Sequence, residues 1–144
     1  MMGDPTVLLV DDNPTFLEVI ERFLNRQGGW QIVAKAGNAT DALRFAQDLA
    51  PDFVLLDLGM PGLTGLELLP LIRSVLPQAG IVILTLLDTE GYTRAALAGG
   101  ADAFISKASL NRDLITELNR IRAERGPARP PIASGTPPVN AAWR

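Results

Sequence analysis

The sequence predicts an α/β protein in which helices cover both faces of a parallel sheet. Short apolar runs alternate five times with longer segments whose apolar residues recur at helical spacing. The apolar runs do not alternate with polar residues, a pattern typical of strands that are buried on both faces. Four of the five runs end at a polar or charged residue, as expected where a ligand binds at the carboxyl ends of the strands. We therefore expect five β-α units in a doubly wound arrangement.

The composition fits one domain and disfavours several kinds of chemistry. Apolar residues make up 47% of the 144 residues, which suffices for a hydrophobic core. The chain has no Cys and no His, so thiolate nucleophiles, Ser-His-Asp triads and zinc hydrolysis are poor candidates. A net charge of −3 argues against electrostatic binding of nucleic acid over the whole surface.

Neither a signal peptide nor a membrane span is predicted. The N-terminus lacks a basic region followed by a long apolar run. The longest apolar stretch, residues 81–87, is too short for a membrane span and is interrupted by Thr85. We expect a soluble, cytoplasmic protein with no membrane partner.

Five strands are expected from apolar runs that are bounded by turn signals. The second is more mixed in character than the others, which indicates an edge position. The expected strands are residues 6–10, 30–36, 53–56, 81–84 and 103–106.

The segments between the strands carry helix-capping residues. Asn13 precedes the first helix, and Thr64 with Glu67 forms a capping box for the third. Pro70 lies inside the third helix, which we expect to kink or to begin later. The fourth helix, residues 88–99, should be held less firmly than the others, because its expected inward positions are small. Those positions are Ala95, Ala96 and Ala98.

The chain is expected to divide into one domain and one tail. The last helix stops at Gly126-Pro127, so residues 1–125 form the domain. Residues 126–144 are rich in proline and lack periodicity, which predicts a disordered tail or the stub of a linker.

The residues at the strand ends indicate phosphoryl chemistry. In an open parallel sheet ligands bind beyond the carboxyl ends of the strands, so Asp11, Asp12, Asp57, Thr85 and Lys107 should converge. Three carboxylates without His or Cys favour the hard ion Mg²⁺. A carboxylate can attack phosphorus to form an aspartyl phosphate, and Asp57 is the natural nucleophile because it is single and central. Thr85 and Lys107 would then contact phosphoryl oxygens.

Each of these residues also has a plain structural interpretation. The Asp11-Asp12 pair before Asn-Pro is, in isolation, more often a helix cap and turn, and Asp57 is about as often a turn residue as a nucleophile. Thr85 in an apolar run is more often a β-former, and Lys107 is more often solvated surface. The functional interpretation is favoured because all of them fall at corresponding strand ends of one sheet.

Four motifs together carry a family resemblance. They are VLLVDDNP, LLDLGMPGLTG, ILT and GGADAFISK, in this order along the chain. The chain resembles the receiver domains of two-component response regulators over roughly residues 6–123, in particular those that precede a helix-turn-helix output domain. The resemblance implies a flavodoxin-like receiver fold with strand order 2-1-3-4-5.

The resemblance also implies the role of each site residue. Asp57 would accept the phosphoryl group from a phosphohistidine of a sensor histidine kinase. Asp12, Asp57 and the backbone carbonyl of Gly59 would bind Mg²⁺ directly, and Asp11 would act largely through water. Lys107 would contact the phosphoryl group.

Thr85 and Phe104 would form a switch pair, in which the hydroxyl moves toward the phosphoryl group and the ring swings inward. For Phe104 the plain role of a core residue fits the sequence equally well. The fourth helix, fifth strand and fifth helix would form the output surface, used for a homodimer or another domain. DNA would be contacted only through an output domain outside these residues.

Two positions, Ala108 and Leu86, depart from the family pattern. Ala108 stands where a proline usually follows the lysine through a cis bond; a non-proline cis bond costs about 3 kcal/mol, so we expect a trans bond there. Leu86 replaces a small residue after the switch threonine and is expected to crowd the phosphoryl pocket. Gly59 leaves room for an attacking water. Gly59 and Leu86 are therefore candidate modulators of the phosphoryl lifetime.

Other functions remain open on the sequence alone. The strongest alternative is a receiver-like interaction module that is not phosphorylated. A Mg²⁺-dependent phosphatase of the haloacid-dehalogenase type is remote, since its second aspartate would stand at Gly59. A flavodoxin-like binder would need a phosphate loop where Asp11 and Asp12 would repel the ligand. We expect no enzyme activity beyond self-phosphorylation from small donors and self-dephosphorylation.

Overall fold

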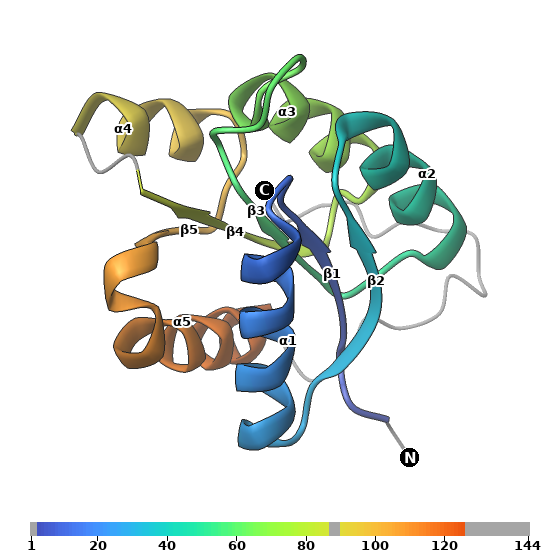
Figure 1. The fold of residues 1–144 in the computed structure, drawn as a ribbon, viewed down its shortest axis with the longest axis vertical. Helices are drawn as coiled ribbons and strands as arrows, with labels where there is room; N and C mark the ends of the chain where they lie inside the picture. Colours follow the sequence, from blue (N-terminus) through green and yellow to red (C-terminus); the bar gives the residue numbers. More distant parts are fainter. Residues whose placement is uncertain (1–2, 87–89, 126–144) are drawn as a thin grey trace.

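A computed structural model describes residues 3–86 and 90–125 and has the predicted architecture. The five strands are parallel and lie in the order β2-β1-β3-β4-β5, which confirms the expected topology (Figure 1). The strands are β1 Thr6–Val10, β2 Gln31–Ala36, β3 Phe53–Leu56, β4 Gly80–Thr85 and β5 Ala103–Ser106.

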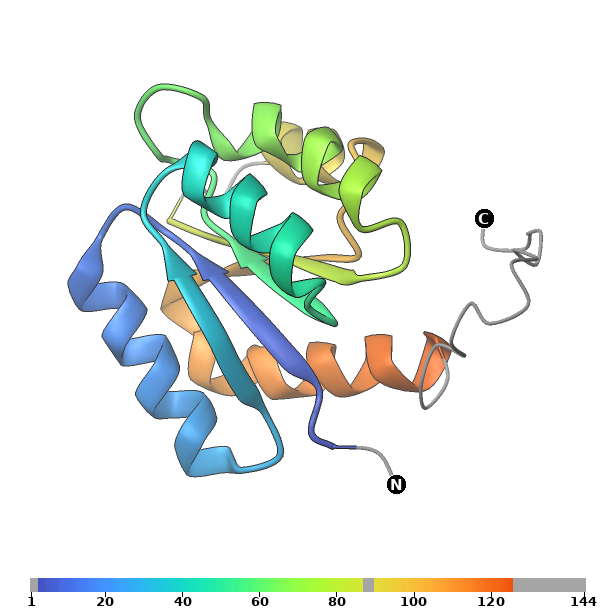
Figure 2. The ribbon, with the colours of Figure 1, turned by 90° about the vertical axis from the view of Figure 1, so that its right-hand side faces the viewer.

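The helices lie in two layers, one on each face of the sheet. Helices α1 and α5 cover one face, and α2, α3 and α4 cover the other (Figures 1 and 2). A short 3-10 helix, η1, joins β5 to α5. The helices are α1 Pro14–Gln27, α2 Ala39–Leu49, α3 Gly65–Val75, α4 Glu90–Ala98, η1 Lys107–Ser109 and α5 Leu110–Arg125.

The sheet separates two apolar clusters because successive side chains of a strand point to opposite faces. In β3, for example, Val54 and Leu56 pack toward α2 and α3, whereas Phe53 and Leu55 pack toward α1 and α5. All four of these residues are buried. This burial on both faces explains why the strand sequences are continuously apolar.

Three strand boundaries differ by one residue from the prediction: the start of β2 and both ends of β4, which runs to Thr85. Strand β2 begins at Gln31, and the preceding Trp30 packs edge-on against Phe53 with ring centroids 5.6 Å apart. Strand β4 begins at Gly80, where a Cβ would lie within 2.6 Å of the Phe53 ring. Because Gly80 has no side chain, β4 can lie directly against the Phe53 ring.

Helix α3 does not begin later in response to Pro70. It starts at Gly65, directly after Thr64, whose side chain accepts from the Glu67 N–H while the Glu67 carboxylate accepts from the Thr64 N–H. This capping box satisfies donors of the first turn. Of the two alternatives expected for Pro70, a kink or a later start, the later start is therefore wrong; Pro70 lies inside the helix.

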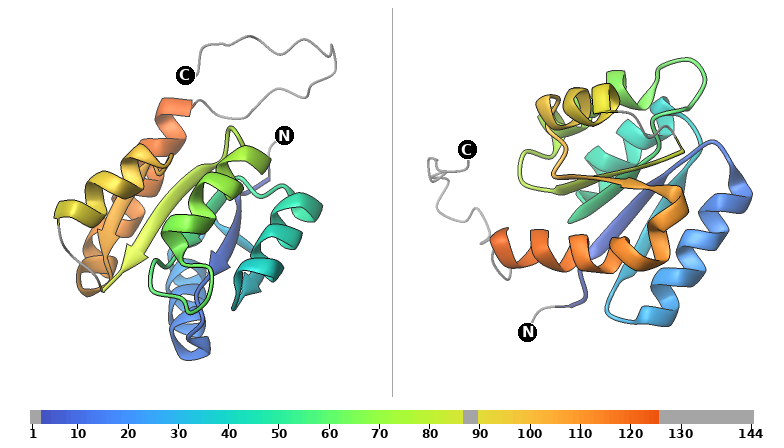
Figure 3. Two further views of the ribbon diagram at one scale, coloured as in Figure 1. Left: turned by 90° about the horizontal axis from the view of Figure 1, so that it is seen from above. Right: turned by 90° about the vertical axis from the view of Figure 1, so that its left-hand side faces the viewer.

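Helix α4 contributes little to the core. Of its three expected inward residues only Ala96 is buried, while Ala95 and Ala98 are exposed, so the prediction was wrong for these two. Figure 3 shows α4 on the same side of the sheet as α3 and opposite α5. By contrast, α5 buries four large apolar side chains: Leu110, Leu114, Leu118 and Ile121.

Two predictions concern residues outside the described ranges. The predicted tail, residues 126–144, lies beyond the described part of the chain. Residues 88–89, the expected start of the fourth helix, also lie outside it. Within the described ranges, no helix combines the length and apolar character needed to cross a bilayer.

Candidate functional site

The strand register brings Asp11 and Asp57 side by side. Val10 is paired with Leu56 in the parallel ladder between β1 and β3, so the next residue of each strand lies at the same edge. The backbone N–H of Asp57 donates to the Val10 carbonyl at 3.0 Å, and that of Asp11 donates to the Ala36 carbonyl at 3.0 Å. Both carboxylates are therefore held on regular backbone rather than on a flexible loop.

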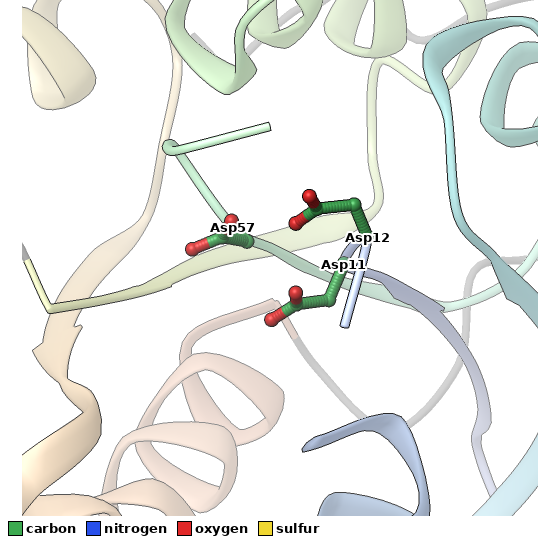
Figure 4. Close-up of side chains that lie close together, drawn as sticks. All are labelled: Asp11, Asp12 and Asp57. Carbon is green, nitrogen blue, oxygen red and sulfur yellow. The ribbon is translucent and has the colours of Figure 1, made fainter. Parts of the chain in front are cut away.

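Three carboxylates converge at this edge. Asp11, Asp12 and Asp57 each offer an oxygen within 4.8 Å of the other two (Figure 4). Asp11 is 3% exposed and Asp57 is 6% exposed, whereas Asp12 is open to solvent. Like charges at this separation repel strongly where water is largely excluded, so the cluster favours a cation.

Lys107 supplies one positive charge to the cluster. Its Nζ lies 2.7 Å from Asp11 Oδ2 and 3.2 Å from Asp57 Oδ1, and its side chain is 11% exposed. The lysine is the first residue of η1, and the Ser106 hydroxyl oxygen accepts from the Ala108 N–H at 3.1 Å. The bond from Lys107 to Ala108 is trans, as predicted, because no described peptide bond is cis. One ammonium among three carboxylates leaves the site negatively charged.

The Asp57 carboxyl is electrostatically unfavourable in its ionised form. Burial raises the pKa of Asp57 above its ordinary value, and the neighbouring charge of Asp11 raises it further. The Lys107 ammonium and the Gly59 N–H, which donates to Asp57 Oδ2 at 3.1 Å, lower this pKa without cancelling the rise. Asp57 is therefore a partly desolvated carboxylate in a site with more negative than positive charge.

The donor set fits a hard divalent cation. Asp11, Asp12 and Asp57 offer carboxylate oxygens that already converge, and hard oxygen ligands suit Mg²⁺. The net negative charge of the three carboxylates and Lys107 favours the binding of such an ion. With the Gly59 carbonyl, these are the residues that would hold it.

Two glycines shape the loop after β3 in different ways. A Cβ at Gly65 would lie 2.2 Å from the Asp57 carbonyl oxygen, so only glycine fits where α3 begins. A Cβ at Gly59 would meet only Asp57 Oδ2, at an ordinary 3.6 Å. Gly65 is therefore required by close approach, whereas a side chain at Gly59 would fit in ordinary contact with the Asp57 carboxylate.

The remaining predicted residues differ in burial and in position on the sheet. Thr85 is 1% exposed at the end of β4, where it pairs in register with Ser106. Phe104 is half-buried on β5 and packs against the cluster under α2, α3 and α4. Leu86 is 74% exposed, so in this structure its bulk points largely to solvent and does not fill the site. The expected crowding by Leu86 is therefore not seen.

Sequence reasoning missed two residues that contact the site. The Lys107 ammonium lies 4.1 Å from the centroid of the Phe16 ring. The Asn13 N–H donates to Asp11 Oδ1 at 2.9 Å, so this helix cap also orients a carboxylate. In the sequence, Phe16 is one of the apolar residues that recur at helical spacing after Asn13, a pattern that predicts only a place on the apolar face of the first helix. Its place in the first turn after the aspartate pair was the available signal.

Known proteins match both the sequence and the fold. A family model described as the response regulator receiver domain matches residues 7–119. The uncharacterized transcriptional regulatory protein YxjL of Bacillus subtilis (strain 168) is 35% identical over 122 residues, which cover 85% of this chain and 55% of that protein. The chain thus spans about half the length of this curated relative.

Solved structures agree with this match. A two-component response regulator of the LuxR family from Aurantimonas sp. SI85-9A1 superposes with a TM-score of 0.80 and 31% identity, over 92% of this chain and 94% of that one. A response regulator from Burkholderia pseudomallei, described with a phosphorylated aspartic acid, calcium ion and citrate, has a TM-score of 0.74 and 27% identity. This match covers 88% of this chain and 76% of the Burkholderia chain.

Proposed function

The chain belongs to the response-regulator receiver family, and from this premise we propose that Asp57 accepts a phosphoryl group from a sensor histidine kinase. The observation that carries the proposal is the placement of Asp57. It is a buried carboxylate at the end of β3, next to Asp11 and Asp12 and within reach of the Lys107 ammonium. A phosphorylated aspartate in the Burkholderia relative supports the same chemistry here.

The transfer is a substitution at phosphorus. A carboxylate oxygen of Asp57 attacks, the new P–O bond forms, and the P–N bond to the kinase histidine breaks with its electron pair returning to the imidazole. When bound by Asp12, Asp57 and the Gly59 carbonyl, with Asp11 acting largely through water, Mg²⁺ supplies the positive charge that the carboxylates and the incoming phosphoryl group require. The strands hold Asp57 in place, which reduces the entropy that is lost when the carboxylate is oriented for attack on phosphorus.

Lys107 and Thr85 would respond to the new group. Lys107 is already shared between Asp11 and Asp57, so a short movement would let it form a charge-assisted hydrogen bond to a phosphoryl oxygen. The Thr85 hydroxyl, at the end of the neighbouring strand, would bond another oxygen. Phe104 would follow Thr85 by moving further into the core.

The output surface comprises α4, β5 and α5. Because Ala96 is the only buried side chain among residues 91–98 of α4, a shift of this helix disturbs little packing. This surface would meet a second copy of the chain or another domain of the same regulator. DNA would be reached through an output domain, as the name of the transcriptional regulatory relative suggests. The lifetime of the phosphoryl group would depend on Gly59 and Leu86.

Intact-mass measurement tests the proposal. With acetyl phosphate and Mg²⁺ the chain should gain the mass of one phosphoryl group, and Asp57→Ala should abolish the gain while circular dichroism remains unchanged. Omission of Mg²⁺ should slow labelling of the wild-type chain. Phosphorylation of another residue would contradict the assignment of Asp57. A chain that takes up neither phosphoryl nor beryllofluoride would instead be an interaction module.

A further inference from the structure

Lys107 has an aromatic neighbour in addition to its two carboxylates. Its ammonium lies 4.1 Å from the centroid of the half-buried Phe16 ring, within the range of an attractive cation–π contact. The lysine side chain is only 11% exposed, so water weakens the contact less than it would at the surface. The ring is thus a third partner of the ammonium.

The position of Phe16 is fixed by the turn that carries the aspartates. Asn13 Oδ1 accepts from the Phe16 N–H at 3.2 Å, while the Asn13 N–H donates to Asp11 Oδ1 at 2.9 Å. Asp11 in turn pairs with Lys107. The ring, the cap, the carboxylate and the ammonium therefore form one closed set of contacts.

Lys107 needs such support because it reaches across the sheet. It follows β5, whereas Asp57 and Asp11 follow β3 and β1, and β4 lies between β5 and β3. A free lysine side chain loses conformational entropy when it is held in one place.

A ring is well suited to hold this particular charge. A fourth carboxylate would bind the ammonium more strongly, but it would compete with the phosphoryl group and add to the repulsion around Asp57. The Phe16 ring attracts the ammonium through its quadrupole and carries no net charge. It also lines the apolar floor beneath the carboxylates, together with Leu17 and Leu84.

We propose that Phe16 is a positioning residue for phosphoryl transfer, whose ring holds the Lys107 ammonium beside Asp57. The inference rests on the proposed function of Asp57 and adds a residue that acts through Lys107. The ring restricts where the ammonium can lie and leaves its N–H donors free to pass from Asp11 to a phosphoryl oxygen.

Nuclear magnetic resonance can observe the contact without metal or phosphate. Lys107 and Lys35 are the only lysines of the chain, so their side-chain signals are readily distinguished. In EDTA, the ε-methylene protons of Lys107 should show a ring-current shift that those of Lys35, paired with Glu21, do not. Phe16→Leu and Phe16→Met should remove this shift, and Phe16→Tyr should keep it.

Phosphorylation kinetics give the functional readout. With acetyl phosphate and Mg²⁺, Phe16→Leu should lower the labelling rate of Asp57 about three- to tenfold, and Phe16→Tyr should restore it. Phe23→Leu is the matched control, since Phe23 is also half-buried on α1 and packs against the same cluster. It should label at the wild-type rate.

The two measurements distinguish failure of the positioning role of Phe16 from failure of the proposed phosphorylation of Asp57. A Lys107 signal that does not change in Phe16→Leu overturns the positioning role, and so does a rate that matches Phe23→Leu. If the wild-type chain takes up no phosphoryl group, the proposed function fails and the positioning role fails with it, even where the lysine signal shows the ring contact.

Discussion

Two polar clusters lie at opposite ends of the sheet, and their charges are arranged in opposite ways. The acidic site, formed by Asp11, Asp12, Asp57 and Lys107, has three carboxylates and one ammonium. The Arg73 cluster lies beside the amino end of β4, where the guanidinium pairs with Asp102 and also donates to backbone carbonyls. Those carbonyls belong to Leu76, Pro77, Ala79 and Gly100.

The difference separates a structural cluster from a functional one. Among the described residues of the Arg73 cluster, the guanidinium lies 2.9 Å from the Asp102 carboxylate, which also accepts from the Ile81 N–H at 2.9 Å. Charge is balanced, and many polar atoms find partners at once. In the acidic site burial and repulsion raise the pKa of Asp57, so the charges favour the arrival of a cation. A cluster that is already neutral stabilises the fold, whereas an unbalanced one is suited to binding.

The largest expected loss of stability comes from removing the guanidinium of the Arg73 cluster. Arg73→Met keeps much of the side-chain length but removes every donor, leaving the charge of Asp102 and several carbonyls with fewer partners. Because the arginine side chain is 21% exposed, water can replace part of what is lost. We expect unfolding in urea to show a loss of about 2–3 kcal/mol.

Arg44→Met provides a matched control. Arg44 pairs with Asp41 one turn away on α2, but both side chains are well exposed. Its removal should cost less than about 0.5 kcal/mol. Equal losses for Arg44 and Arg73 would mean that the Arg73 cluster is not a structural clamp, and the contrast between the two ends of the sheet would lose its basis.

The acidic site should respond in the opposite direction. In EDTA at neutral pH, Asp57→Asn removes a buried charge next to Asp11 and leaves Lys107 paired one-to-one. We expect the variant to be more stable than the wild-type chain by about 1 kcal/mol. Urea unfolding of both chains at the same pH measures this difference.

The pH dependence follows from the raised pKa of Asp57. The folded state binds this proton more tightly than the unfolded state, whose pKa is near the ordinary 3.8. The stability that Asp57 contributes is therefore full below pH 3.8 and is lost as pH rises through the folded-state pKa. The advantage of Asp57→Asn should shrink toward low pH. An advantage of Asp57→Asn that stays the same at every pH would contradict the electrostatic cause.

The contrast also shows which parts of the molecule a sequence can reveal. Asp57 and Lys107 were predictable because strand ends fall together once the β-α alternation is known. The Arg73 cluster was not, because a lone arginine near the end of a helix suggests only an interaction with the helix dipole. Its partners are set by how the loops before β4 and β5 fold.

Helix α4 shows the same limit for packing. Ala95, Ala96 and Ala98 are all small and apolar, so the sequence pattern could not tell which of them faces the core. Only Ala96 does. The expectation of weak packing did not depend on that choice, since any alanine buries little surface. Strongly patterned elements such as β3 were accordingly easier to predict than α4.

The smallest effect on stability is expected at Asp12, the exposed member of the acidic site. Without Mg²⁺, Asp12→Asn should change the free energy of unfolding by no more than about 0.5 kcal/mol, because water already solvates this carboxylate. With Mg²⁺ the wild-type melting temperature should rise in proportion to binding, and the variant should lose most of that rise. Thermal melts over a Mg²⁺ titration, with Asp48→Asn as the charge-matched control, measure both quantities. A variant that keeps the full Mg²⁺ response would remove Asp12 from the metal site, and the excess of negative charge would then need another explanation.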